Sequence, residues 1–231
     1  MKKFLTIICM LAMFTSFASC GETADNSSTG ETLANNSVIA ENYEINEFEW
    51  NVNGNRLYYY VKIHNSNEDY CIKYPKFKVT AKDKDGIVLG TEEQMLSIIY
   101  PNQDFIYASD VGSVEEIPSE VNIEIVEPEK RHFIKESESE YSGYKPLTVI
   151  NTTVRESGLT PKMVGEVQND NDFAIEHAVI AIVYIDKDGK YIPAANPTFV
   201  DNISANSSVA FETSISKDYK NFDYEVYANI W

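Results

Sequence analysis

The sequence predicts an all-β protein made of two tandem copies of one small module. Three observations predict it. From residue 42 onward, apolar residues alternate with polar ones in short runs separated by Asn, Asp, Gly and Pro, and a period of two is typical of strands. No stretch in that part of the chain keeps a helical period. A longer pattern, marked by Asp-Lys-Asp-Gly at 83–86 and again at 186–189, occurs twice and indicates an internal repeat.

The chain begins with two lysines and an apolar run that ends at Ser19. Such a run is typical of a signal peptide, and it is shorter than the roughly 20 residues of a membrane-spanning helix. It leads into Phe17-Ala18-Ser19-Cys20, which resembles the bacterial lipobox. The resemblance implies that residues 1–19 are removed and that the Cys20 thiol carries diacylglycerol. We therefore expect an extracytoplasmic protein, lipid-anchored in the cell membrane or the outer membrane. The alternative is a plain secretory peptide with an incidental cysteine.

Removal of residues 1–19, which hold two lysines and no acidic residue, moves the formal net charge from −17 to −19. A surface this acidic repels phosphate backbones, so nucleic acid is not expected as a partner. Cysteine use is sparse: with Cys9 removed and Cys20 lipidated, Cys71 remains alone. We expect no intramolecular disulfide and no cysteine-based metal site, and we expect Cys71 to be a small buried apolar residue.

Residues 20–41 are rich in Ser, Thr, Asn, Gly and Glu. Few large apolar side chains are available there for burial, so the composition predicts a disordered tether behind the lipid. A flexible chain of this length spans roughly 25 Å, which would lift the first module off the membrane.

The first module is predicted at residues 42–127. On one of its strands the apolar side chains are Leu57, Tyr59, Val61 and Ile63, which alternate with Tyr58, Tyr60, Lys62 and His64. On a second strand Phe77, Val79 and Ala81 alternate with Lys76, Lys78, Thr80 and Lys82. Each strand is therefore expected to bury one face.

The second module is predicted at residues 145–231, after a charged, Ser-rich linker at 128–144. Asn65-Ser66-Asn67 of the first copy matches Asn169-Asp170-Asn171 of the second, and Pro101-Asn102 matches Ala205-Asn206. A period near one hundred residues is that of a whole domain, and several short strands in each copy favour an immunoglobulin-like sandwich.

The order of these parts resembles the FxLYD family of bacterial β-sandwich modules. The second copy carries the resemblance with Asn169, Ile182, Tyr184, Asp186, Gly189, Ala205-Asn206 and Phe211. The first copy keeps several of these places but has Ala81-Lys82 where an aromatic residue is expected. The resemblance implies an extracytoplasmic module without an assigned catalytic activity.

The paired acids of Asp-Lys-Asp-Gly raise the question of calcium. A full EF-hand loop needs a Glu at its twelfth position, but Gln94 and Pro197 stand there. A strand-connecting turn, in which Asp caps the backbone and Gly takes a positive φ, is the favoured interpretation. The three histidines lack metal-ligand spacing, and no nucleophile elbow or phosphate loop occurs. We therefore expect no metal, no cofactor and no enzymatic activity.

Two surfaces are candidates for binding. Trp50, Tyr58 and Tyr60 could form an aromatic platform for a glycan or a protein, although cross-strand aromatic pairing that only stabilises the sheet is favoured. The second candidate surface is one face of a strand in the second copy, where the two copies differ in polarity. The outward Lys76, Lys78, Thr80 and Lys82 correspond, 103 residues later, to Val179, Ala181, Val183 and Ile185.

A strand that is apolar on both faces is normally covered on both sides. The cover over Val179, Ala181, Val183 and Ile185 could be the module's own segments, the first module, a second copy of the chain or an envelope protein. The sequence thus predicts a non-enzymatic lipoprotein of the cell envelope that acts as a binding or scaffold module. A glycan-binding surface lipoprotein is the alternative.

Overall fold

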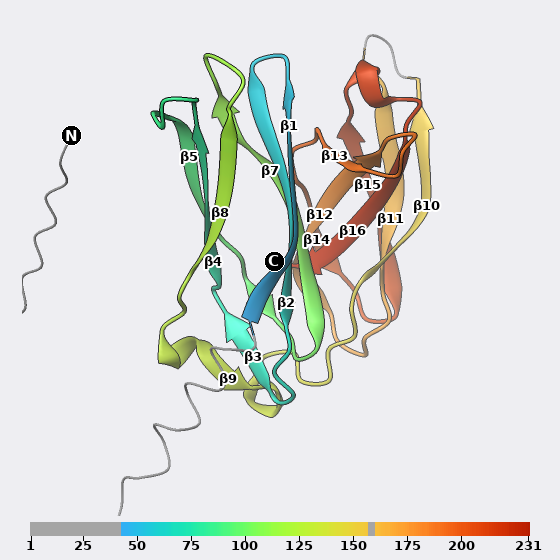
Figure 1. Cartoon of the computed structure of the whole chain (residues 1–231). Coiled ribbons are helices and arrows are strands. Elements are labelled where there is room, and N and C mark those ends of the chain that lie inside the picture. The colour runs from blue at the N-terminus through green and yellow to red at the C-terminus, as the bar shows by residue number, and fades with distance from the viewer. Residues whose placement is uncertain (1–42, 157–159) are drawn as a thin grey trace, which may run out of the picture.

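Sheets stacked in four layers make up the protein in its computed structural model, which describes residues 43–156 and 160–231 (Figure 1). All strand pairs are antiparallel, and the predicted all-β sandwich class is confirmed. The described residues contain no helix of the length and apolarity needed to cross a membrane. The predicted signal peptide, the predicted lipidation site at Cys20 and the predicted tether lie outside the described residues.

The N-terminal half of the described chain, residues 43–126, supplies the first two layers. Layer 1 contains β5 (Val88–Met95), β4 (Lys76–Lys82) and β8 (Glu120–Val126), in that order. Layer 2 contains β1 (Tyr43–Asn53), β2 (Arg56–Asn65) and β7 (Gln103–Ser113). A small sheet at the base contains β6 (Ile98–Ile99), β3 (Tyr70–Lys73) and β9 (Phe133–Lys135).

The C-terminal half, residues 148–231, supplies the other two layers. Layer 3 contains β13 (Tyr191–Pro193), β12 (Ile175–Ile185), β14 (Thr198–Ile203) and β16 (Asp223–Ile230). Layer 4 contains β10 (Thr148–Arg155), β11 (Lys162–Asn169) and β15 (Ser207–Ser214). Three short 3-10 helices lie at Lys130–His132, Glu136–Glu138 and Lys217–Tyr219.

The alternating strands bury the faces that the sequence predicts. Leu57, Tyr59, Val61 and Ile63 of β2 are fully buried, as are Phe77, Val79 and Ala81 of β4. Tyr59 and Phe77 meet edge to face between layers 1 and 2, with ring centroids 5.8 Å apart. The lysines of β4 point away from this core and are half-buried. Cys71 is fully buried as expected, and burial raises the pKa of its thiol to about 12.

β12 is apolar on both faces because it lies in an inner layer. One face packs Ile180, Ile182 and Tyr184 into the core of the C-terminal half. The other face lies against layer 2 of the N-terminal half. There, Ala181 and Val183 share a cluster with Tyr60, Ile106 and Ala108, and Val179 joins the core of the N-terminal half.

A buried asparagine closes the same turn in each half. The Asn65 side-chain amide donates to the carbonyls of Tyr70, Ile99 and Tyr100, at 2.8 to 3.2 Å. The amide of Asn169, 104 residues later, makes the equivalent three bonds in the C-terminal half, also at 2.8 to 3.2 Å. The repeat in the sequence therefore corresponds to a repeated network of buried hydrogen bonds, which is costly to leave unmade.

The two Asp-Lys-Asp-Gly segments form matching turns. The carboxylate of Asp83 accepts from the backbone N–H groups of Asp85 and Ile87, each at 2.8 Å. Asp186 does the same at 2.8 and 2.9 Å. Gly86 and Gly189 have φ of 82° and 81°, a conformation that glycine adopts at little cost.

The segment predicted as a linker, 128–144, is bound to the body of the protein. Its short apolar pair, Phe133-Ile134, belongs to β9 and pairs with β3. Tyr141 and Tyr144 pack against the core of the C-terminal half, and that core also contains Cys71 and Tyr100 of the N-terminal half. Because apolar contacts cross the boundary between the halves, the number of independently folding domains stays a prediction.

We expect Val183→Asp to lower the free energy of unfolding by about 3–5 kcal/mol, because it places an unpaired charge between layers 2 and 3. The matched control is Thr80→Asp, at the equivalent position 103 residues earlier on the half-buried outer face of β4. This control should change stability by no more than about 0.5 kcal/mol. Urea unfolding followed by circular dichroism measures both. Equal effects would mean that the face of β12 is not buried between the halves.

Candidate binding site

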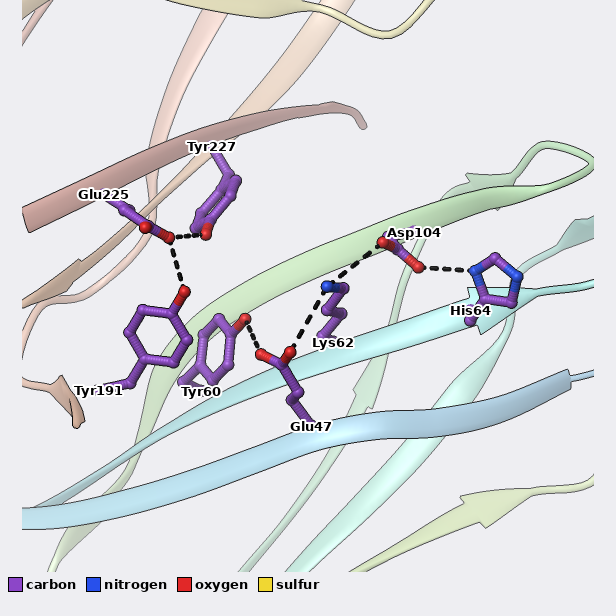
Figure 2. A network of polar contacts seen from close by, with 8 residues as sticks. All are labelled: Glu47, Tyr60, Lys62, His64, Asp104, Tyr191, Glu225 and Tyr227. Atoms are coloured by element: carbon purple, nitrogen blue, oxygen red, sulfur yellow. Dashed lines mark hydrogen bonds and ion pairs between the residues drawn. The ribbon is translucent and has the colours of Figure 1, made fainter. Parts of the chain in front are cut away.

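A network of polar side chains rims the contact between layers 2 and 3 (Figure 2). On the layer 2 side, the hydroxyl of Tyr60 donates to Glu47 at 3.0 Å. On the layer 3 side, the hydroxyls of Tyr191 and Tyr227 both donate to Glu225. The rings of Tyr60 and Tyr191 join the two groups, with centroids 5.2 Å apart.

The network continues along layer 2 away from the contact. The Lys62 ammonium lies 3.5 Å from carboxylate oxygens of Glu47 and of Asp104, and Asp104 lies 2.7 Å from Nδ1 of His64. Partial burial lowers the pKa of Lys62, but the two carboxylates outweigh it and raise the pKa overall. Every group named here already has a partner, so the network fastens the layers and leaves no free nucleophile.

The three aromatic residues proposed as a platform do not lie together. Trp50 pairs with Tyr59 across β1 and β2 and packs toward the core of the N-terminal half. Tyr60 points the other way and is buried, with 1% of its surface exposed. Trp50 lies opposite Tyr59 and so shares a face with it, whereas Tyr58 and Tyr60 lie on the other face of the sheet. Layer 3 covers Tyr60. No single exposed platform forms.

Tyr58 lies in a separate, open groove between the halves, with a volume of about 610 Å³. Its other lining residues are mostly polar and include Asn53, Asn196, Lys162 and Glu212. The ring of Tyr58 is half-buried. Of Tyr58 and Tyr60, the two candidate aromatic residues of β2, only Tyr58 lines this groove.

The apolar set on β12 is also accounted for. Val179, Ala181 and Val183 are fully buried against the N-terminal half, so they are not free to bind a foreign partner. Ile185 is half-buried at the end of β12, where it pairs with Tyr191 and Asp223. Of the possible covers for this face, the one that the structure shows is the first module.

A pocket of about 200 Å³ opens at the base of the molecule, where the two halves and the connecting segment meet. Lys73 is the last residue of β3 and Tyr74 follows it, and Glu176 and His177 come from the start of β12. These two pairs stand at equivalent positions, 103 residues apart. The connecting segment adds Glu140 and Tyr141, and the remaining lining residues are Ser97, Ile98, Tyr100, Ile230 and Trp231.

Stacking contacts hold the aromatic rings of the pocket in place. The ring of Trp231 stacks on Tyr107, at 5.7 Å and an angle of 10°. Tyr141 stacks on Phe173, with centroids 5.3 Å apart. Rings held in this way lose little freedom when a ligand binds, which favours affinity.

Tyr74 stands at the rim of the pocket in an unusual backbone conformation. Its φ is 54°, which is rare for a bulky residue, and Pro75 follows it. This kink separates β3 from β4, whereas β12 runs straight through the equivalent position. As a result 47% of the Tyr74 surface is exposed. Strained residues of this kind concentrate at ligand-binding positions.

Sequence reasoning missed the pocket because five separate segments contribute to it. One signal was present: Tyr74-Pro75 interrupts the first copy where the second copy continues with His177-Ala178. Among residues 43–156 and 160–231, no three His, Cys, Asp or Glu side chains are grouped so that they could hold a metal ion.

No family model and no curated protein matches the chain. The chain is similar to the crystal structure of red sea bream transglutaminase, with a TM-score of 0.27 and 9% sequence identity. The match covers 76% of this chain and 27% of that one, so the chain spans about a quarter of the length of that protein. This likeness is too slight to support an inference about function. The resemblance to the FxLYD family stays a prediction.

One carboxyl group outside the pocket has an altered acidity. Glu92 on β5 is half-buried, and burial, followed by repulsion from Asp110, raises its pKa from 4.5 to about 7. A raised pKa in the folded state means that the contribution of Glu92 to stability is complete below pH 4.5. That contribution is lost as the pH rises through 7.

We therefore expect Glu92→Gln to stabilise the protein at pH 8, by about 1 kcal/mol after allowance for partial exposure. The substitution should have little effect at pH 4, where the carboxyl group is already neutral. Thermal unfolding of both proteins at the two pH values tests this. Glu124→Gln, at an exposed position of β8 in the same sheet, is the control. A gain at pH 8 no larger than the gain at pH 4 would refute the raised pKa.

Proposed function

We propose that the chain is a lipid-anchored, extracytoplasmic binding protein without enzymatic activity, and that its binding site is the pocket at the base. The pocket itself is the observation that carries this proposal. It joins aromatic walls and unpaired charges in one concave site, as small-ligand sites commonly do. The lipobox resemblance at Cys20 supports the proposed location.

The four-layer body supports a binding role in a second way. Pocket residues come from both halves, and the buried face of β12 holds the halves together. The site is therefore preformed, and binding does not have to order it. A scaffold role is compatible with the same rigid body, with the pocket as the point of attachment.

Glycan binding is a second candidate function, and the groove at Tyr58 favours it. That groove is open, about 610 Å³ in volume, and lined by polar side chains beside one aromatic ring. Sugars bind to such surfaces through hydrogen bonds to their hydroxyl groups and stacking on a ring. Of the three residues predicted as an aromatic platform, Trp50, Tyr58 and Tyr60, only Tyr58 is part of this proposed glycan site.

Lipid attachment is tested with an alkyne analogue of palmitate fed to cells that express the full chain. We expect the label on the wild-type protein and its loss in Cys20→Ser. We also expect the variant to leave the membrane fraction, because lipid chains supply the anchoring energy. Cys71→Ser is the control and should keep the label. Equal labelling of Cys20→Ser and the wild-type protein would overturn the proposed anchor.

Site-specific photocrosslinking on intact cells tests the binding role. A photoreactive amino acid replaces Tyr74 in the pocket, Tyr58 in the groove or, as a control, Ile117, which is 73% exposed on a distant loop. We expect one recurrent adduct from position 74 and none from position 117. A glycan recovered from position 58 alone would favour the second candidate. Adducts that do not differ among the three positions would contradict both.

A further inference from the structure

The charges that line the basal pocket are not balanced. Glu140 and Glu176 are exposed carboxylates, and neither has an ion-pair partner within the described part of the chain. The basic lining residues are His177 and Lys73. Nδ1 of His177 lies 2.7 Å from Asp201, and the ammonium of Lys73 lies over the ring of Tyr74, 5.5 Å from its centroid. With two carboxylates set against the single ammonium of Lys73, the net charge of the lining is negative.

The two carboxylates lie near one ring. Burial raises the pKa of the Tyr141 hydroxyl, and the negative charge of Glu140 raises it further, whereas a hydrogen bond with the backbone of Glu176 acts in the opposite direction. Both carboxylates line the same pocket as the Tyr141 ring: Glu140 precedes that residue in the connecting segment, and Glu176 comes from the start of β12. A ligand group beside Tyr141 would meet both charges together.

The walls of the pocket are apolar and aromatic. Its lining includes the buried side chains of Ile98, Tyr100 and Ile230 and the more exposed rings of Tyr74, Tyr141 and Trp231. Aromatic rings attract cations to their faces, and the position of Lys73 over Tyr74 is one instance of this within the chain. The whole protein, with its formal charge of −17, adds a long-range attraction for positive ligands.

We propose that the basal pocket takes an ammonium or guanidinium group carried on a short apolar stem. The stem lies between the rings of Tyr141 and Trp231, and the cationic head lies between the carboxylates of Glu140 and Glu176. A small free amine and the side chain of a lysine or arginine on a peptide share this chemistry. The proposal rests on the proposed function and deepens it by naming the ligand class.

A charge series on one stem tests the proposal with the purified full chain in a non-ionic detergent. The probes are phenethylammonium, 2-phenylethanol and phenylacetate, which differ mainly in charge. Trp231 lines the pocket, so its fluorescence reports binding. We expect saturable binding of phenethylammonium with a Kd of about 1 mM or tighter, as suits so small a ligand. Binding of the neutral probe should be at least about tenfold weaker, and the anion should not bind.

Three substitutions locate the head group. Glu176→Gln and Glu140→Gln should each weaken phenethylammonium binding by about five- to tenfold, since each removes one attractive charge. Lys73→Met should strengthen it by a few fold, because it removes a competing cation. Glu124→Gln, on an exposed position of β8 in layer 1, is the matched control and should leave binding unchanged.

The peptide acetyl-Gly-Lys-Gly-amide, compared with its norleucine counterpart, separates the two sources of the cation. Tighter binding of the lysine peptide than of phenethylammonium assigns the site to a protein partner, and the reverse order assigns it to a small amine. Equal binding of the three phenyl probes, preference for phenylacetate, or no saturable binding would overturn the ligand class. Lipid labelling and crosslinking at position 74 would then still decide the proposed function separately.

Discussion

Burial of the outer face of β12 is the contact on which the rest of the molecule depends. Ala181 and Val183 carry no polar atoms in their side chains, and they lie against Tyr60, Ile106 and Ala108 of the other half. Left in water, this strip would be a continuous apolar patch. Its burial fixes how the halves lie, and side-chain hydrogen bonds at the edges then set the register. Asn51 donates to Tyr219 at 3.0 Å, and Asn229 donates to the carbonyl of Ile106 at 2.8 Å.

The outer faces of the four-layer stack carry polar side chains in the described chain. A repeat that packs on the copy before it forms a head-to-tail contact, and such contacts can continue indefinitely. Layer 1 presents lysines of β4 where layer 3 has apolar residues. Layer 4 presents Glu166 and Gln168 of β11, and Glu166 accepts hydrogen bonds from Ser208 and Asn151. Polar terminal faces cap a repeated structure and keep it soluble.

The two halves share their buried asparagine networks and their aspartate turns, and they differ where the pocket forms. Shared features close the same loops and keep the same topology, so they carry no information about a ligand. At Tyr74-Pro75 the N-terminal half loses a continuous strand and exposes a ring, while the C-terminal half keeps β12 intact through Glu176 and His177. The difference between the copies thus produces a concave site of mixed chemistry.

The sequence by itself determined the strands, their buried faces and the repeat. Period-two alternation in β2 and β4 identified Leu57 and Phe77 as core residues, because successive side chains of a strand point to opposite faces. It also identified the face of β12 as covered. Only the tertiary structure decided what lies over that face. An apolar strand is buried equally well by the first module, by a second copy of the chain or by a foreign protein. Trp50 and Tyr60 show the same limit: alternation separates them, but only the stacking of layer 3 on layer 2 buries Tyr60. The pocket was decided wholly by tertiary structure, because its lining comes from segments between residues 73 and 231 that no local pattern connects.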